Sequence, residues 1–166
     1  GGSGGTESVT ATYASSMPTA EMPTRDGYAF GGYYTEANGG GTQYYSTQGA
    51  SAQAWYLTDD TTLYANWTAN KYTVTLNKQG GSGGPDSVTA TYNSELPTVT
   101  TPTRTGYTFG GYFTGENGGT QYYSSAGASV RNWTLTYNAT LYAKWTAKTS
   151  TVTFDQQDGS GGTKSV

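Results

Sequence analysis

Adjacent carboxylates are the residues of this 166-residue chain with the clearest capacity for catalysis, and Asp59–Asp60 is such a pair. Two neighbouring carboxyl groups can divide the acid and base roles of a hydrolytic reaction. A later copy of the same stretch, however, has Tyr137–Asn138 at these positions, so we interpret the pair as part of a solvated turn. The chain contains no Cys and no His, which excludes thiol and imidazole chemistry. We therefore expect no catalytic residue and no enzyme activity.

Carboxylates near the C-terminal end raise the question of a metal site. Asp155 and Asp158, in the stretch DQQDGSGG, could offer oxygen ligands to calcium. The matching stretch 77–84 (NKQGGSGG) has no carboxylate, and the spacing lacks the EF-hand pattern. We interpret the stretch as a turn, and we expect no metal and no other cofactor.

Charge and hydropathy exclude two further partner classes. Only 11% of the residues are charged, the net charge is −3, and 33% are hydrophobic. One basic position repeats, as Arg25 and Arg104, which is too little for a nucleic-acid footprint. No apolar run is long enough for membrane insertion. A polar surface with so little charge favours a β-rich extracellular protein.

Tyrosine supplies the remaining binding chemistry, with 16 residues in the chain. The pairs Tyr44–Tyr45 and Tyr122–Tyr123 follow Gly-rich loops, and neighbouring strand residues face opposite sides of a sheet. We therefore expect one member of each pair to be exposed. Tyr64 and Tyr142 alternate with apolar neighbours and should also face outward. Such tyrosines could cover a sheet through cross-strand pairs, contact a protein partner or stack on a glycan.

Internal repetition organises all of these residues. The matching stretches are 1–13 and 80–92 (GGSGG followed by SVTATY), 27–34 and 106–113 (GYAFGGYY and GYTFGGYF), 62–69 and 140–147 (TLYANWTA and TLYAKWTA), and 73–76 and 151–154 (TVTL and TVTF). We divide the chain into repeat 1 at 1–69, which lacks its first strand, a complete repeat 2 at 70–147, and 148–166, the first strand and start of repeat 3. The chain then reads as a window of a longer array.

Period-two alternation predicts a mainly β fold. Apolar and polar residues alternate along 8–13, 63–67 and 73–76, and Thr, Val and Tyr suit a half-buried strand. The Gly-rich stretch GGSGG should connect two strands of a hairpin. Only 50–55 and 128–133 could form a helix, so we expect at most one short helix in each repeat.

The order of these motifs resembles a known family. TVT(L/F), a Gly-rich loop, SVTATY, PTR, GY(A/T)FGGY and LYA(N/K)W are similar to the Listeria–Bacteroides repeat, the B-repeat of listerial internalins. The resemblance covers nearly the whole chain. It implies β-grasp-like small domains in tandem on a bacterial surface protein, and it supplies no catalytic residue.

The phase of the repeat predicts a mismatch between the two ends of the chain. If TVTL pairs with the SVTATY that follows it, then repeat 1 has an open slot beside Ser8, Val9, Thr10, Ala11, Thr12 and Tyr13. The spare strand is Thr151, Val152, Thr153 and Phe154. Unpaired strand edges bind other strands, so these two segments are candidate self-assembly strands. In the alternative phase each TVTL packs on the preceding copy, and nothing is missing.

These observations favour a structural role. We expect a stalk, spacer or filament-forming segment at the cell surface, whose partners are neighbouring repeats or copies of itself, arranged head to tail. The alternative is an adhesin module that binds a host or matrix protein, or a glycan, through its Tyr-rich loops.

Overall fold

The structure is a computed structural model, and it describes residues 1–155 and 157–162. Its described part is built from eight strands and one short 3-10 helix, in two sheets. The elements are β1 (Tyr28–Tyr34), η1 (Ala37–Gly39), β2 (Gln43–Tyr45), β3 (Tyr64–Ala69), β4 (Lys71–Asn77), β5 (Ser87–Thr91), β6 (Tyr107–Gly115), β7 (Gly118–Tyr123) and β8 (Ala139–Ala147). The mainly β fold predicted from the alternation is confirmed.

The first sheet has three antiparallel strands in the order β2-β1-β3. Its central strand contains a bulge, because the pairing of β1 with β3 shifts between Phe30 and Tyr33. Gly32 lies in that bulge at φ +111, and a Cβ there would collide with the carbonyl oxygen of Tyr45. Gly111 has the same role in β6. Only glycine fits both the positive φ and the close backbone approach.

The second sheet has five strands in the order β5-β4-β8-β6-β7. Strands β6, β7 and β8 repeat the arrangement of the first sheet, and β4 and β5 extend it. Strand β4 runs parallel to β8 and antiparallel to β5. The Gly-rich stretch therefore closes a hairpin, as predicted. Lys78 and Asp86 lie at the two ends of the hairpin loop, and the Lys78 ammonium donates to the Asp86 carboxylate at 2.6 Å. This bond lowers the pKa of Asp86.

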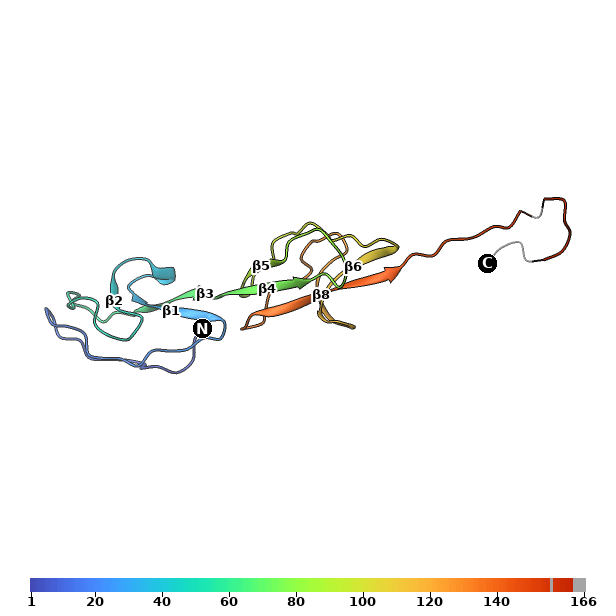
Figure 1. Ribbon diagram of the computed structural model, residues 1–166. Coiled ribbons are helices and arrows are strands. Elements are labelled where there is room, and N and C mark those ends of the chain that lie inside the picture. The colour runs from blue at the N-terminus through green and yellow to red at the C-terminus, as the bar shows by residue number, and fades with distance from the viewer. Residues whose placement is uncertain (156, 163–166) are drawn as a thin grey trace.

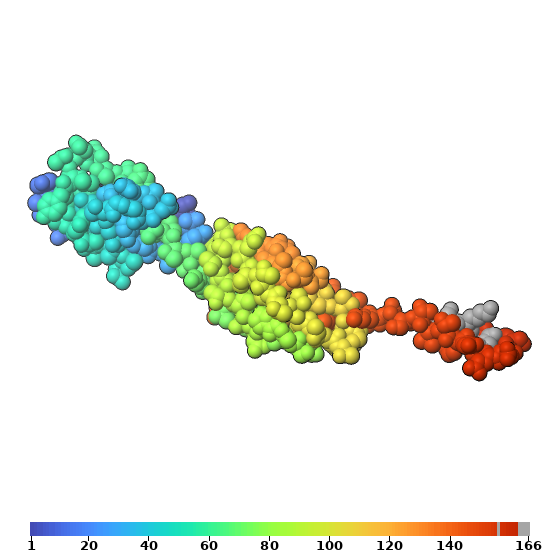
Figure 2. All heavy atoms as spheres, turned by 90° about the horizontal axis from the view of Figure 1, so that it is seen from above, coloured from blue at the N-terminus to red at the C-terminus, as the bar shows by residue number. Residues whose placement is uncertain are grey.

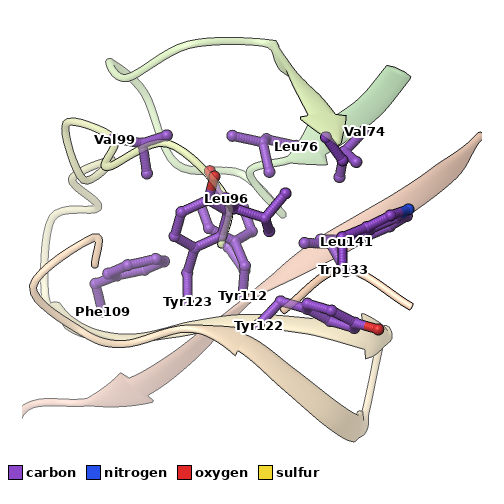
Figure 3. Close-up of a cluster of buried hydrophobic side chains, with 12 residues drawn as sticks. Val74, Leu76, Leu96, Val99, Phe109, Tyr112, Tyr122, Tyr123, Trp133 and Leu141 are labelled. Atoms are coloured by element: carbon purple, nitrogen blue, oxygen red, sulfur yellow. The ribbon is translucent and has the colours of Figure 1, made fainter. Parts of the chain in front are cut away.

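The core of the second repeat consists of apolar and aromatic side chains from every strand of its sheet and from the loops between them (Figure 3). Val74 and Leu76 contribute the inward face of β4, at 0% and 3% exposure. Trp133, from the loop before β8, is fully buried among them. The first repeat has a smaller buried cluster, formed by Met17, Tyr44, Tyr45 and Trp55.

The two repeats lie end to end in an elongated molecule (Figures 1 and 2). Strand β3 leads into β4 through the single residue Asn70, so one extended segment crosses from the first sheet to the second. Residues 148–155 and 157–162 project from the far end of the second repeat (Figure 1). The part of the chain that the structure describes contains no helix with the length and apolar character that a membrane span requires.

The limit of at most one short helix in each repeat is confirmed for the described residues, whereas two segments expected to be strands are not strands. Residues 50–55 and 128–133 form no helix, because their backbone bonds to other segments. The backbone amide of Trp55 donates to the Ser15 carbonyl, and that of Trp133 donates to the Ser94 carbonyl, each at 2.8 Å. Residues 8–13 form no strand. Residues 151–154 contain only an isolated bridge at Thr153. Alternation makes a segment suitable for a sheet, but a strand also needs a neighbouring strand to bond with.

Candidate functional site

The paired tyrosines are core residues, which corrects the expectation that one member of each pair is exposed. The exposure of Tyr44, Tyr45, Tyr122 and Tyr123 is between 0% and 3%. Neighbouring strand residues do face opposite sides, but both sides of these short hairpins are covered. Tyr44 packs on Trp55 at 4.7 Å, while the Tyr45 hydroxyl donates to the Pro18 carbonyl at 2.8 Å. Loops that follow and precede the hairpin therefore bury one tyrosine each.

The outward tyrosines of the two sheets differ from each other. Tyr64 is 46% exposed, whereas Tyr142, its counterpart, is half-buried. Tyr142 is shielded by the strand beside it, since it lies opposite Asn77 of β4. The first sheet has no strand at that edge. Contact with a partner through Tyr64 stays a prediction.

The acidic pair lies in the loop before β3, as two exposed residues. The Thr61 hydroxyl donates to the backbone carbonyl of Asp59 at 2.9 Å, a bond that shapes a turn. Asp155 and Asp158 lie in the projecting tail. Within residues 1–155 and 157–162, no three acidic side chains converge on a position where a metal ion could bind.

An open groove of about 980 Å³ runs along one side of repeat 1. One wall is the segment 6–13 and the other is the segment 57–63. Its floor consists of apolar side chains at the surface of the small core. Among these are Met17, Ala20, Tyr33 and Trp55.

The corresponding slot of repeat 2 is occupied by β4, whose two neighbours in the sheet are β5 and β8. Val74 pairs with Val88 on one side and with Ala139 on the other. The counterparts of these two walls in repeat 1 are the walls of the groove. Leu141 and Ala90, in the strands on either side of β4, are fully buried, whereas their counterparts Leu63 and Ala11 remain partly exposed.

The joint between the repeats is a feature that sequence reasoning missed. The backbone amide of Asn70 donates to the Gly27 carbonyl, and the backbone amide of Tyr92 donates to the Asn70 carbonyl, both at 2.9 Å. The Tyr92 ring meets the edge of Tyr28 at 5.4 Å and covers Gly27, where a Cβ would collide with the ring. One available signal was Gly27 itself, which immediately precedes Tyr28. The other was the single residue between two strand patterns.

The model of the Listeria–Bacteroides repeat domain matches residues 1–66 and 72–144, which is most of the chain. The chain belongs to the Listeria–Bacteroides repeat family. The two matched ranges fall on either side of the joint at Asn70. The family assigned from the motifs is therefore confirmed, as is the presence of two tandem copies.

Relatives of this Listeria–Bacteroides repeat pair are longer proteins. Internalin H of Listeria monocytogenes is 36% identical over 78% of the chain. A glycine-rich protein of Evansella cellulosilytica, named as a membrane protein, is 33% identical over 92% of it. The chain spans 21% and 16% of the length of these two proteins. No solved structure is significantly similar to the chain.

Proposed function

We propose that the chain is a spacer segment of a bacterial surface protein, in which repeats stacked end to end hold other parts of the protein away from the cell. The observation that carries this proposal is the joint at Asn70. One extended segment crosses it without a flexible linker, and hydrogen bonds flank it on both sides. Membership in the Listeria–Bacteroides repeat family supports a surface location, because the family's repeats are expected in tandem on bacterial surface proteins.

The alternative role as an adhesin has less support. It depended on exposed tyrosine pairs in the loops at 36–46 and 115–124, and those four tyrosines are buried. A spacer holds the parts of a protein on either side of it at a fixed distance, and for this it needs only rigid repeats and a rigid joint.

The joint can be tested with two glycine variants that share the same backbone conformation. Gly27 and Gly106 are counterparts at φ +77 and φ +79, so alanine strains both equally. Only Gly27 lies under an aromatic ring, while Gly106 has open space around it. We expect Gly27→Ala to displace Tyr92 and to loosen the joint, and Gly106→Ala to leave it intact.

Small-angle X-ray scattering, extrapolated to infinite dilution, measures this difference. The wild type and Gly106→Ala should show one extended, rigid particle. Gly27→Ala should show a broader distribution of distances between the repeats. Equal profiles for the two variants, or a flexible wild type, would contradict the spacer proposal.

A further inference from the structure

We propose that the groove of repeat 1 accepts residues 151–154 of a second copy of this chain, in the position that β4 has in repeat 2. This inference rests on the proposed end-to-end stacking and extends it from repeats of one chain to separate chains. Strand addition to an open sheet edge is an established mode of recognition, with backbone bonds for affinity and side-chain pockets for specificity.

The first line of support is that the groove and the β4 site have the same walls. In repeat 2, strand β8 begins at Ala139, and its first residues pair with β4 in parallel. In repeat 1, β3 begins only at Tyr64, so the counterpart residues 61–63 belong to no strand. Residues 8–12 likewise have the sequence of β5 without its strand. Both walls therefore lack regular structure at the positions that β4 bonds in repeat 2.

A polar group is already in place for the incoming backbone. In repeat 2, the Thr73 amide donates to Asn138 Oδ1 at 2.8 Å. Asp60 is the counterpart of Asn138, it lines the groove, and its carboxylate retains an acceptor oxygen. The amide of Thr151, the counterpart of Thr73, would donate to it.

The side chains of the donor fit the floor of the groove. Val152 and Phe154 are the counterparts of Val74 and Leu76, and they are 53% and 50% exposed in the tail. Phe154 is larger than Leu76. The groove compensates, because Ala20 stands where repeat 2 has Val99, a member of the same buried cluster as Leu76. Burying an exposed Val or Phe side chain contributes about 1.5–3 kcal/mol.

The contacts of the joint would form again between the two copies. The donor copy already has one of the two backbone bonds of such a joint. The Lys148 backbone amide donates to the Gly106 carbonyl at 2.9 Å, as the Asn70 amide does to the Gly27 carbonyl. The acceptor has the other half in Tyr13, the counterpart of Tyr92, which is 61% exposed. Space above Gly106 is open for that ring, and Tyr107 lies beside Gly106 in the position of Tyr28.

Donor and acceptor lie at opposite ends of the molecule. The tail leaves the far end of repeat 2, while the groove belongs to repeat 1 (Figure 1). One molecule therefore cannot satisfy its own groove in this arrangement. A head-to-tail contact of this kind generates an open filament, or a ring if the rotation between successive copies closes.

Register-specific crosslinking of the full chain tests the proposal. Thr73 lies directly opposite Thr89 in the β4–β5 pair, and their counterparts are Thr151 and Thr10. Cysteines at facing positions of an antiparallel pair lie close enough for a disulfide. The chain has no cysteine of its own. On oxidation, Thr10→Cys/Thr151→Cys should give a ladder of multimers, and the out-of-register control Ser8→Cys/Thr151→Cys should give far less.

Light scattering of cysteine-free protein provides the second measurement. The mass of the wild type should grow with concentration. Val152→Asp should abolish this growth. Thr153→Asn, at the counterpart of the outward-facing and exposed Thr75, should retain most of it. The substitutions lie in the tail, outside both sheets, so the folds stay intact. A constant wild-type mass, or equal ladders from both cysteine pairs, would overturn the proposal. The scattering profile at infinite dilution would still report on the spacer function separately.

Discussion

At the scale of single residues, the tyrosines of this chain act mainly as core side chains. Repeat 2 buries Tyr112 and Tyr123 completely, and their rings meet at 6.0 Å. A polar chain with few aliphatic residues needs such large side chains to build a core, since each buries about 150–250 Å². The sequence pattern placed these residues on strands correctly. It could not reveal the loops that cover the hairpin, because those contacts join distant segments.

Burial of these phenols predicts a loss of stability at alkaline pH. Burial raises the pKa of Tyr112 to about 12, with a further contribution from the negative charge of Asp86. Burial, with Tyr112 as a neighbour, also raises the pKa of Tyr123 to about 12. An unfolded tyrosine ionises near pH 10. Stability should therefore be complete below about pH 10 and fall as the pH rises toward about 12, because the unfolded chain then releases protons more readily.

Thermal unfolding followed across this pH range, together with tyrosinate absorbance, measures the loss. Tyr112→Phe is the informative variant, because among the described residues the buried Tyr112 hydroxyl has no hydrogen-bond partner. Removing an unpaired buried hydroxyl is close to neutral at pH 7 and should reduce the alkaline loss. An unchanged pH dependence in this variant would contradict the assignment.

At the scale of elements, the same five-residue sequence forms a strand in one repeat and no strand in the other. SVTAT forms β5 at 87–91, but the same five residues at 8–12 form no strand. The difference is the neighbour, because β4 lies beside the second copy and nothing in the described chain lies beside the first. Alternation therefore predicted β4, most of β3 and β5, whose partners are present, and failed at 8–13 and 151–154. Residues 50–55 could have formed a short helix, but the backbone of Trp55 bonds to Ala14 and Ser15 instead.

The polar anchor of β4 can be measured by removing it. Asn138→Ala deletes the acceptor of the Thr73 amide and should cost repeat 2 about 0.5–1.5 kcal/mol of unfolding free energy. Asp60→Ala changes the counterpart in repeat 1, where the structure gives that side chain no such bond. Under monomeric conditions, denaturant unfolding should therefore show a loss for Asn138→Ala alone. Equal losses for both variants would mean that the bond to Thr73 is not the source.

At the scale of the whole molecule, the repeat is completed by a strand that enters from the neighbouring repeat. Strand β4 continues β3 of the first repeat but belongs to the sheet of the second. The joint therefore combines a covalent connection with the backbone hydrogen bonds of Asn70 to both repeats, which explains how the two repeats stack without a linker. The motifs alone left two phases open, because both place TVTL next to a plausible partner. Only the observed pairing of β4 distinguishes them.

The most direct test of this account supplies the strand to repeat 1 within one chain. Residues 148–157 fused before Gly1 reproduce the order of repeat 2, in which the strand and Gln79 precede Gly80. The parent for comparison is the Val152→Asp chain, which should stay monomeric. We expect two thermal transitions in the parent, with repeat 1 the less stable, and a rise of at least several degrees for repeat 1 in the fusion. An unchanged lower transition in the fusion would show that the groove does not accept the strand, and it would contradict the account.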